Sequence, residues 1–217
     1  MSDILLAVRD LGVRRGARHV LRGVNLELMA GDRLVLEGPI GAGKTSLMLA
    51  LMGLIPRAQG ELTWWGSLCQ READFARIRG SVGLLFQDPD DQLIGPTVLE
   101  DVEFGPLNLG RSPAEAHALA ESILERLSLE ALASRPIHEL SGGEKRLVAL
   151  AGLLAMSPRV LLLDEPTVAL DEQACARVFA VLRSLDITLL IATHDVKTVA
   201  HLATRRGVLR EGELSVR

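Results

Sequence analysis

The sequence has few cysteines and few aromatic residues. Of its 217 residues only two are cysteine and 3% are aromatic, and there is no tyrosine at all. Cys69 and Cys175 lie far apart in the chain and match no metal-binding spacing. We therefore expect reduced thiols, as in cytosol, and neither a disulfide framework nor a cysteine metal site.

Long apolar runs and an excess of positive charge are also absent. The longest apolar stretch, Leu147–Met156, is shorter than the roughly 20 residues of a membrane-spanning helix. No basic region followed by an apolar one opens the chain, so nothing suggests secretion. The formal net charge of −4 argues against a nucleic-acid binder that works by bulk charge. A role at a membrane would therefore require a partner protein.

What is present is the composition of a folded domain, with 48% hydrophobic and 24% charged residues. Short apolar or alternating runs predict strands over 5–8, 20–28, 33–37, 61–68, 82–86, 159–163 and 187–192. Helical spacing and start signals predict helices over 44–55, 112–127, 141–155, 171–184 and 195–203, before a hairpin turning at 211–212. This order predicts an α/β fold with a mostly parallel core sheet and an N-terminal antiparallel β region. We divide the single domain into a core, about 1–87 and 141–217, and a helical subdomain over about 88–140.

A glycine-rich motif follows the predicted strand 33–37. It fits the pattern G-x-x-x-x-G-K-[ST] and consists of Gly38, Pro39, Ile40, Gly41, Ala42, Gly43, Lys44 and Thr45, with Ser46 next. Glycines let successive backbone N–H groups curl around phosphate oxygens, and the start of the following helix adds a favourable dipole. Lys44 is then placed to neutralise the β- and γ-phosphates, and the Thr45 hydroxyl to bind Mg²⁺. The motif predicts an ATP-phosphate site; the alternative is a glycine-rich turn that carries Lys-Thr by chance.

Two carboxylates follow another apolar strand. Val160–Leu163 is typical of a strand buried on both faces, and Asp164 and Glu165 come at its carboxyl end, where open α/β sheets bind ligands. Beside a phosphate site, Asp164 would hold the Mg²⁺ shell and Glu165 would polarise the attacking water as general base. The alternative, a solvated acid at a strand end, is weaker once the glycine-rich motif is considered.

A third motif begins the predicted helix 141–155 and consists of Ser141, Gly142, Gly143 and Glu144. Ser141 and Glu144 have the spacing of an N-terminal capping box. The two glycines are poor helix formers, each costing up to ~1 kcal/mol relative to alanine. They are understandable if a ligand approaches the bare backbone of this helix start, and an anion is the natural ligand there.

With these three motifs in this order, the sequence resembles the ATP-binding-cassette (ABC) ATPases, over essentially the whole chain. The resemblance implies a P-loop hydrolase fold of the ABC type, ATP and Mg²⁺ as cofactors, and a head-to-tail dimer. In that dimer Ser141 and its glycines contact the γ-phosphate held by the other subunit. The resemblance also gives Gln87 the role of sensing Mg²⁺ and water, and His194 that of a switch histidine. It assigns the loop linking the two sites to Ala169, Leu170 and Asp171.

Two positions depart from the family's pattern. The family stacks an aromatic ring on adenine shortly before the strand leading to the phosphate loop, but no aromatic residue precedes Trp64. The corresponding place falls near Arg15 and Val20, and a guanidinium can stack on a base; a solvated arginine is the alternative. The linking loop has Val168 and Ala169 where the family often has smaller residues, so we expect its geometry to differ in detail.

The segments 87–93, 97–102 and 104–110 resemble one branch of the family, the ATPases of energy-coupling-factor importers, which take up cobalt, nickel, biotin and other vitamins. This resemblance implies two partners at the cytoplasmic face of the membrane, a transmembrane scaffold subunit and a substrate-binding membrane subunit. Residues 97–102 predict a short amphipathic helix, so the residues expected to contact the scaffold are Asp91, Val98, Leu99 and Val102. A solvated acidic turn is the alternative.

The presence of every motif in one chain favours a homodimer, with a heterodimer with a related ATPase as the alternative. Other functions to weigh are an ATPase of a different ABC importer or exporter and a DNA-associated ABC ATPase. The latter would need a long coiled-coil insertion between Gln87 and Ser141, and we expect no nucleic-acid partner. A non-hydrolysing regulatory cassette is disfavoured because Lys44, Glu165 and His194 are all intact.

Overall fold

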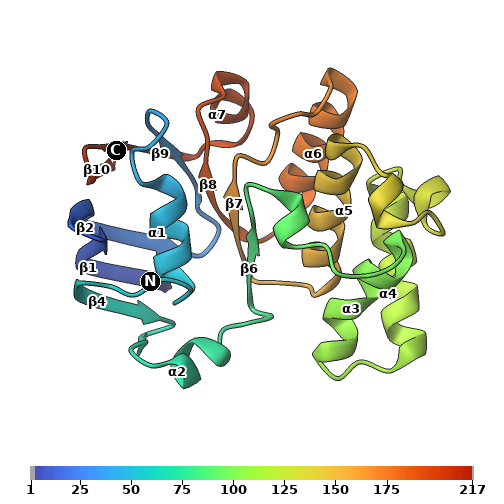
Figure 1. Cartoon of the computed structure of the whole chain (residues 1–217), viewed down its shortest axis with the longest axis horizontal. Helices are drawn as coiled ribbons and strands as arrows, with labels where there is room; N and C mark the ends of the chain where they lie inside the picture. The colour runs from blue at the N-terminus through green and yellow to red at the C-terminus, as the bar shows by residue number, and fades with distance from the viewer. Residues whose placement is uncertain (1–2, 217) are drawn as a thin grey trace.

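The computed structural model describes residues 3–216, and the side chains of all of these except Val196 and Lys197. Its strands form two sheets, with helices between and beside them (Figure 1). The first sheet has the order β2-β1-β4-β5 and consists of β1 (Ile4–Arg15), β2 (Arg18–Met29), β4 (Gln59–Trp64) and β5 (Ser67–Leu68). Its neighbouring strands are antiparallel, which confirms the predicted β region at the N-terminal end.

The second sheet has the order β10-β9-β3-β8-β7-β6. It consists of β3 (Arg33–Glu37), β6 (Val82–Leu85), β7 (Val160–Asp164), β8 (Thr188–Ala192), β9 (Arg205–Arg210) and β10 (Glu213–Val216). The pairs β9–β3, β3–β8, β8–β7 and β7–β6 are parallel, and β10 runs antiparallel to β9. The predicted mostly parallel core sheet is therefore confirmed.

The central strands β7 and β8 are buried along their whole length. Their apolar sequences lack a polar alternation because elements pack on both faces of the sheet. In such a sheet the loops that follow the parallel strands meet at one edge. The segments after β3, β6, β7 and β8, which carry most of the predicted site residues, therefore converge.

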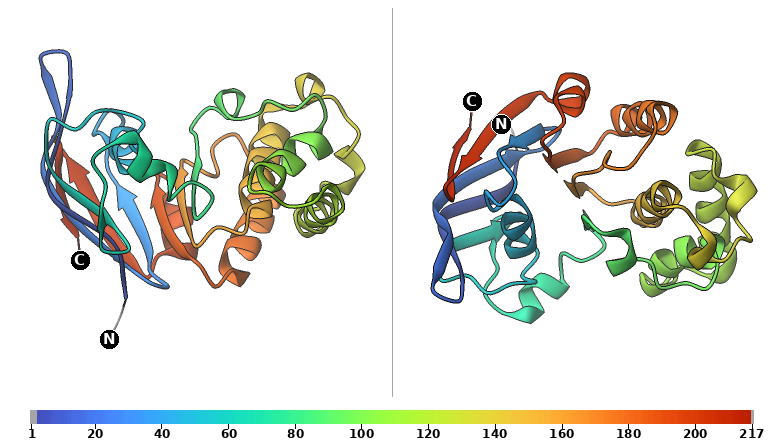
Figure 2. Two further views of the ribbon diagram at one scale, coloured as in Figure 1. Left: turned by 90° about the horizontal axis from the view of Figure 1, so that it is seen from below. Right: turned by 45° about the horizontal axis from the view of Figure 1, so that its top comes forward.

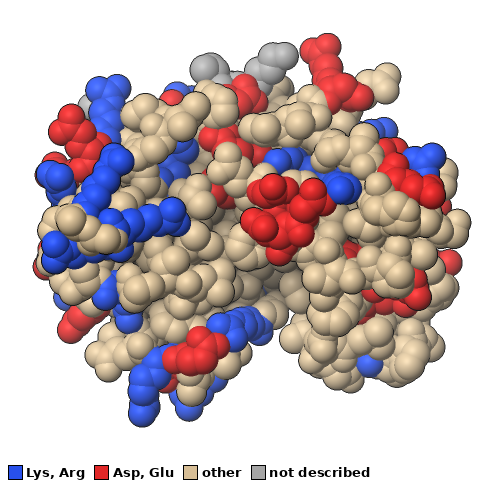
Figure 3. Space-filling view, viewed as in Figure 1, with Lys and Arg blue, Asp and Glu red and all other residues tan. Residues whose placement is uncertain are grey.

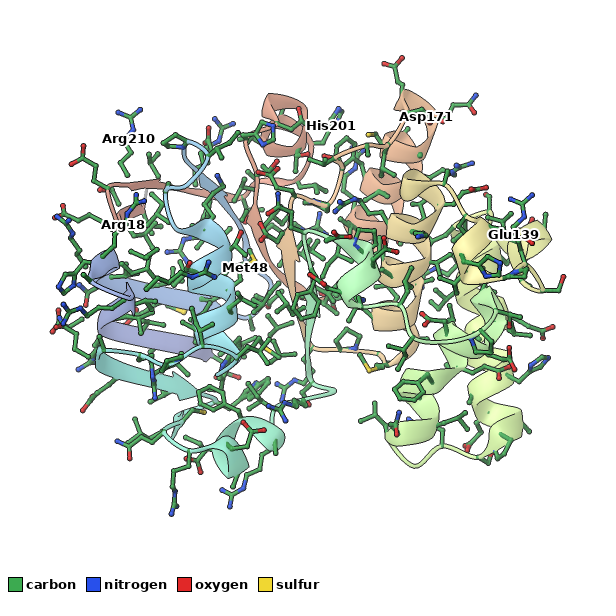
Figure 4. The ribbon with its side chains drawn as sticks, viewed as in Figure 1. Arg18, Met48, Glu139, Asp171, His201 and Arg210 are labelled. Atoms are coloured by element: carbon green, nitrogen blue, oxygen red, sulfur yellow. The ribbon has the colours of Figure 1, made fainter. Side chains whose placement is uncertain are left out.

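Buried apolar side chains form two clusters. The first joins the two sheets through α1 (Lys44–Leu51), whose Met48 lies between them together with Leu6, Leu62, Leu34 and Leu162 (Figure 4). The second lies on the other face of the second sheet and includes residues of α3 (Val98–Asn108), α4 (Pro113–Arg126), α5 (Gly142–Ala155), α6 (Glu172–Ser184) and α7 (Val196–Leu202). The parallel sheet is thus the wall shared by both clusters.

The helices α3 and α4 lie at the end of the molecule opposite the first sheet (Figure 2). The predicted capping box opens α4, because the Ser112 amide donates to Glu115 Oε2 (2.9 Å) and the Glu115 amide donates to Ser112 Oγ (3.4 Å). Helix α5 packs against both α3 and α4, so the helical end extends beyond residue 140. The division into a core and a subdomain over 88–140 stays a prediction.

Several elements differ from the sequence-based expectation. The predicted strand 61–68 is divided into β4 and β5 by a turn at residues 65–66. Strand β1 continues to Arg15 instead of ending near Val8, because β-bulges interrupt its alternation. A short helix, α2 (Glu72–Ala76), was not predicted. Helix α3 runs to Asn108 and includes Pro106, well beyond the short helix predicted over 97–102. Within residues 3–216, the helices are too short or too polar to cross a membrane.

Candidate active site

A cavity of about 470 Å³ lies where the loops after β3, β6 and β7 meet. Its walls are Arg15, Arg18, Val20, Ile40, Gly41, Ala42, Gly43, Lys44, Thr45, Ser46, Gln87, Asp164 and Glu165. Residues of two motifs, the glycine-rich loop and the Asp164–Glu165 pair, therefore line one space together with Gln87, which the family resemblance had indicated. The signature residues Ser141–Glu144 and the linking loop 169–171 are not among its walls.

The glycine-rich loop has the geometry that its sequence predicts. Gly43 precedes α1 in a left-handed conformation, with φ of 106°, and a Cβ there would lie 2.9 Å from a methyl of Leu21. At Gly38 a Cβ would lie 2.3 Å from the carbonyl oxygen of Leu209. A side chain at either position would displace the loop from β2 or β9. The glycines therefore let the backbone pass close to two neighbouring strands at the start of a helix, where anions bind.

The Lys44 side chain is buried and folds back over this loop. Its Nζ donates hydrogen bonds to the carbonyl oxygens of Gly38 (2.7 Å) and Pro39 (3.2 Å). The ammonium group is therefore held against the glycine-rich loop at the wall of the cavity. This places a cation where bound phosphates would lie.

Asp164, at the end of β7, has a buried carboxylate whose Oδ2 has no hydrogen-bond partner. Burial raises the pKa of Asp164, and a hydrogen bond with the Thr45 side chain and the charge of Lys44 oppose this rise. A buried, unpaired carboxylate oxygen beside a threonine hydroxyl suits a hard cation. The site thus fits Mg²⁺, which proteins hold through one or two carboxylates together with substrate phosphates.

Glu165 is held rigidly beside His194. Its backbone has a φ of 50°, which is uncommon for a residue other than glycine. Its Oε1 lies 2.8 Å from His194 Nδ1, and its Oε2 accepts hydrogen bonds from Thr193 Oγ1 (3.0 Å) and the His194 amide (3.3 Å). A carboxylate oriented in this way at the cavity wall has the arrangement expected of a general base with a fixed partner.

The predicted capping box at the start of α5 is present. The Ser141 amide donates to Glu144 Oε2 (2.7 Å) and the Glu144 amide donates to Ser141 Oγ (3.3 Å). Hydrogen bonds from the side chain and the amide of Ser141 to the Glu144 carboxylate lower the pKa of Glu144. A Cβ added at Gly142 would meet no heavy atom within 4 Å. The backbone at Gly142 is therefore open to an approaching group, whereas a Cβ at Gly143 would lie 3.1 Å from the Ala169 carbonyl oxygen. Both glycines lie outside the first cavity.

A second, wider hollow of about 830 Å³ lies beside the first. Its walls include Thr45, Gln87, Gly142, Lys145 and Ala169, together with the acidic turn 88–91. The linking loop enters it with Ala169 in a left-handed conformation (φ 65°), and Asp171 caps α6 by accepting a hydrogen bond from the Ala174 amide (2.7 Å) (Figure 4). One signature residue, Gly142, and one linking-loop residue, Ala169, therefore line this hollow, and Thr45 and Gln87 line both cavities.

Arg15 and Val20 line the first cavity, as expected for residues near a base. Arg18, which the sequence analysis missed, lines it too. Arg15 and Arg18 are paired across the two-residue turn between β1 and β2. Recognition of Gly16 as part of a two-residue hairpin turn would have indicated from the sequence that Arg15 and Arg18 lie opposite each other. The cavity wall has no aromatic side chain, in agreement with the departure noted from the family's pattern.

The prediction that Val98 and Val102 contact a membrane partner is wrong for these two side chains. Both have an exposed fraction of 0% and pack in the second hydrophobic cluster, because they lie one turn apart on the inward face of α3. Leu99 is half-buried and Asp91 is exposed. The exposed apolar side chains of this region are Ile94, Phe104, Leu107 and Leu109.

Residues 21–168 match the model of the ABC transporter family. A provisionally named ABC transporter ATP-binding protein of Brucella suis is 50% identical over 210 residues, which cover 97% of this chain and 87% of that protein. The energy-coupling factor transporter ATP-binding protein EcfA of Methanothermobacter thermautotrophicus is 43% identical over 215 residues (97% and 69%). The cobalt import ATP-binding protein CbiO of Rhodobacter capsulatus is 44% identical over 218 residues (99% and 78%).

The chain is also similar to solved structures of ABC transporter proteins. The cbiO1 structure from Clostridium perfringens, part of an ABC transporter complex, superposes with a TM-score of 0.85 at 33% identity, covering 98% of this chain and 87% of that one. A bacterial ABC transporter cassette solved as a dimer superposes with a TM-score of 0.89 at 27% identity, covering 98% of both. The chain therefore belongs to the ABC transporter family and is an ATP-hydrolysing subunit of that family.

Proposed function

We propose that this chain is the ATPase of an energy-coupling-factor importer that takes up a transition-metal ion, cobalt or nickel, or a vitamin such as biotin. The observation that carries the proposal is the similarity to EcfA and CbiO over nearly the whole chain. The similar region includes the segment after Gln87, which by its sequence resembles the same branch of the family.

The cavity residues have distinct roles in the proposed hydrolysis. Lys44 and the amides of the glycine-rich loop bind the phosphates, and Asp164, Thr45 and Gln87 would hold Mg²⁺, which neutralises phosphate charge. Glu165 accepts the proton of the attacking water, and its contact with His194 Nδ1 fixes the orientation of the carboxylate. The negative charge that develops on the phosphoryl oxygens is stabilised by Lys44.

A second copy of the chain completes each site in this proposal. The start of α5 is open to an approaching group at Gly142, and Ser141–Gly143 does not line the phosphate cavity of its own chain. A head-to-tail homodimer would bring the helix start of one copy to the γ-phosphate of the other. A heterodimer with a related ATPase is the alternative arrangement.

The charge of the helical end supports a membrane partner with basic cytoplasmic segments. Residues 88–140 contain eleven Asp and Glu against three Arg, whereas the remaining residues contain seventeen acidic and twenty-one basic ones. On the face shown in Figure 3, Lys and Arg gather over the β1–β2 end and an acidic group lies near the centre. Cytoplasmic loops of membrane proteins carry an excess of Lys and Arg. The acidic region, with Ile94 and Phe104 exposed, suits a scaffold helix that has both basic and apolar side chains.

The test is affinity purification of the tagged chain from its own membranes, followed by uptake assays with the recovered complex. We expect a transmembrane scaffold and a small substrate-binding membrane subunit to co-purify. We expect ATP-dependent uptake of cobalt, nickel or biotin, with Lys44→Ala as the inactive control. Co-purification with an exporter, or with an importer that uses a soluble substrate-binding protein, would replace this proposal with that other class of ABC transporter.

A further inference from the structure

Arg146, in the second turn of α5, is a buried cation whose contacts were not predicted from the motifs. Its side chain lies inward with an exposed fraction of 5%. Its Nη2 donates to the carbonyl oxygen of Gln87 (2.6 Å) and its Nη1 to that of Glu165 (3.0 Å). One guanidinium therefore joins the signature helix to the ends of β6 and β7.

The charge of this side chain is balanced by carboxylates of the site. Burial lowers the pKa of Arg146, and the charges of Asp88, Asp164 and Glu165 oppose that change. Arginine remains protonated under such conditions, and its fork of donors reaches two acceptors at fixed geometry. The contacts are therefore directional as well as electrostatic.

The bond to Glu165 falls at a strained point of the backbone. Glu165 has a φ of 50°, and its amide donates to the Ala192 carbonyl oxygen (2.8 Å) while its carbonyl oxygen accepts from Arg146. The peptide groups on both sides of this residue are thus anchored. Uncommon backbone conformations persist where the surrounding structure fixes them. At Glu165 the two anchored peptide groups fix the backbone and so set the direction of the side chain.

The segment after β6 is tied to α5 by two further side chains. Lys145 Nζ forms an ion pair with Asp90 Oδ1 (2.6 Å), and Gln92 Nε2 donates to the Ala149 carbonyl oxygen (2.9 Å). Residues 87–92 are therefore attached to the first half of α5. Arg146 differs from these two because it also reaches the residue after β7.

We propose that Arg146 is a positioning residue that couples the start of α5 to the hydrolytic groups of the same chain. A γ-phosphate bound by a second copy at Ser141 and Gly142 shifts α5, and Arg146 carries that shift to Glu165 and Gln87. The inference rests on the proposed function, which makes Glu165 the general base and places phosphate of the other copy at Ser141.

The experiment compares Arg146→Met and Arg146→Lys in the full-length chain with the control Arg126→Met. Arg126 lies on α4 and donates to Ser184 Oγ (3.2 Å), away from the cavity. Thermal unfolding, ATP dissociation constant, kcat and KM are measured for each variant, and each is repeated in the Glu165→Gln background. Methionine keeps much of the side-chain volume but donates nothing, whereas lysine keeps the charge without the fork.

We expect kcat to fall ~10²-fold in Arg146→Met and about 10-fold in Arg146→Lys, because small misplacements of catalytic groups have effects of this size. The ATP dissociation constant should change by less than about 3-fold. In the Glu165→Gln background, Arg146→Met should lower the rate little further, since residues acting as a unit are not additive. The control Arg126→Met should retain wild-type turnover.

A wild-type kcat in Arg146→Lys would overturn the inference. If Arg146→Met does not fold, the test rests on Arg146→Lys alone. A full further loss in the Glu165→Gln background would also overturn it, because Arg146 would then act independently of Glu165. The general-base role of Glu165, on which the inference rests, fails in a different way, through wild-type hydrolysis by Glu165→Gln itself. The proposed importer function fails through co-purification with another class of transporter.

Discussion

His194 Nδ1 lies 2.8 Å from Oε1 of Glu165, although the two residues are 29 positions apart in the chain. The contact exists because β7 and β8 are parallel neighbours, so the residues that follow them emerge side by side. It joins an acid found from one motif with a histidine identified only by family resemblance. In the proposed reaction Glu165 accepts the proton of the attacking water and His194 orients the Glu165 carboxylate, so removal of either side chain should have related effects.

Glu165→Gln should lower the hydrolysis rate by ~10²–10⁴, the usual contribution of a positioned general base, and leave ATP binding intact. Lys44→Ala should instead weaken ATP binding, because phosphate charge would remain uncompensated. Steady-state hydrolysis and equilibrium titration with ATP separate the two effects. Wild-type turnover by Glu165→Gln would show that another group accepts the proton.

The dimer prediction can be tested at Gly142. A Cβ there has open space in the single chain, so Gly142→Leu should fold normally. In a head-to-tail dimer the same side chain would obstruct the phosphate of the second copy. By sedimentation with ATP and Mg²⁺, Glu165→Gln should be a dimer and the Gly142→Leu, Glu165→Gln double variant a monomer. If the double variant is still a dimer, the contact between the two copies lies elsewhere on the chain.

Replacement of Asp164 by asparagine should stabilise the nucleotide-free protein while abolishing Mg²⁺-dependent hydrolysis. The folded-state pKa of Asp164 is raised above 3.8, so its contribution to stability is greatest below that value and declines as pH rises through the folded pKa. At neutral pH the buried charge therefore destabilises the fold. We therefore expect a higher melting temperature for Asp164→Asn than for wild type at pH 7. The difference from wild type should disappear near pH 3; a lower melting temperature at pH 7 would contradict the assignment.

Discrimination between ATP and GTP should be modest. The cavity wall offers Val20 and the guanidinium groups of Arg15 and Arg18 toward a base, and no aromatic ring. Phosphate contacts then dominate affinity, and either purine can stack on an arginine. Competition binding should give a preference below ~100-fold, or about 2.7 kcal/mol. A larger preference would require an adenine-specific contact.

Coupling to the membrane partner should depend on Asp91 and Phe104, both exposed at the helical end. Asp91→Arg and Phe104→Asp should abolish uptake by the assembled transporter while the purified subunit still binds ATP. Glu213→Arg, on β10 at the other end of the chain, is the charge-matched control. Full uptake by both variants would place the coupling surface elsewhere.

The sequence predicted what depends on spacing along the chain. The glycine loop, the Asp164–Glu165 pair and the capping boxes at Ser112 and Ser141 are each formed within a few residues, so local rules were sufficient. Arg146 and Arg18 were missed because their roles depend on which distant backbone or strand lies beside them. Val98 and Val102 were wrongly predicted to contact a membrane partner because the predicted helix, 97–102, has fewer than two turns. The sequence of so short a helix does not show which apolar side chains pack inward.

The uneven distribution of charge makes the molecule an electric dipole, with the acidic helical end at one pole and the arginine-rich β1–β2 end nearer the other. An anionic lipid surface repels the acidic pole, whereas basic loops projecting from a scaffold attract it. A diffusing subunit would therefore be turned toward its partner before contact, which raises the association rate. The rate should fall steeply with ionic strength, since the Debye length shortens to about 8 Å at 0.15 M salt. The same field would prevent the subunit from settling on bare membrane with its helical end inward.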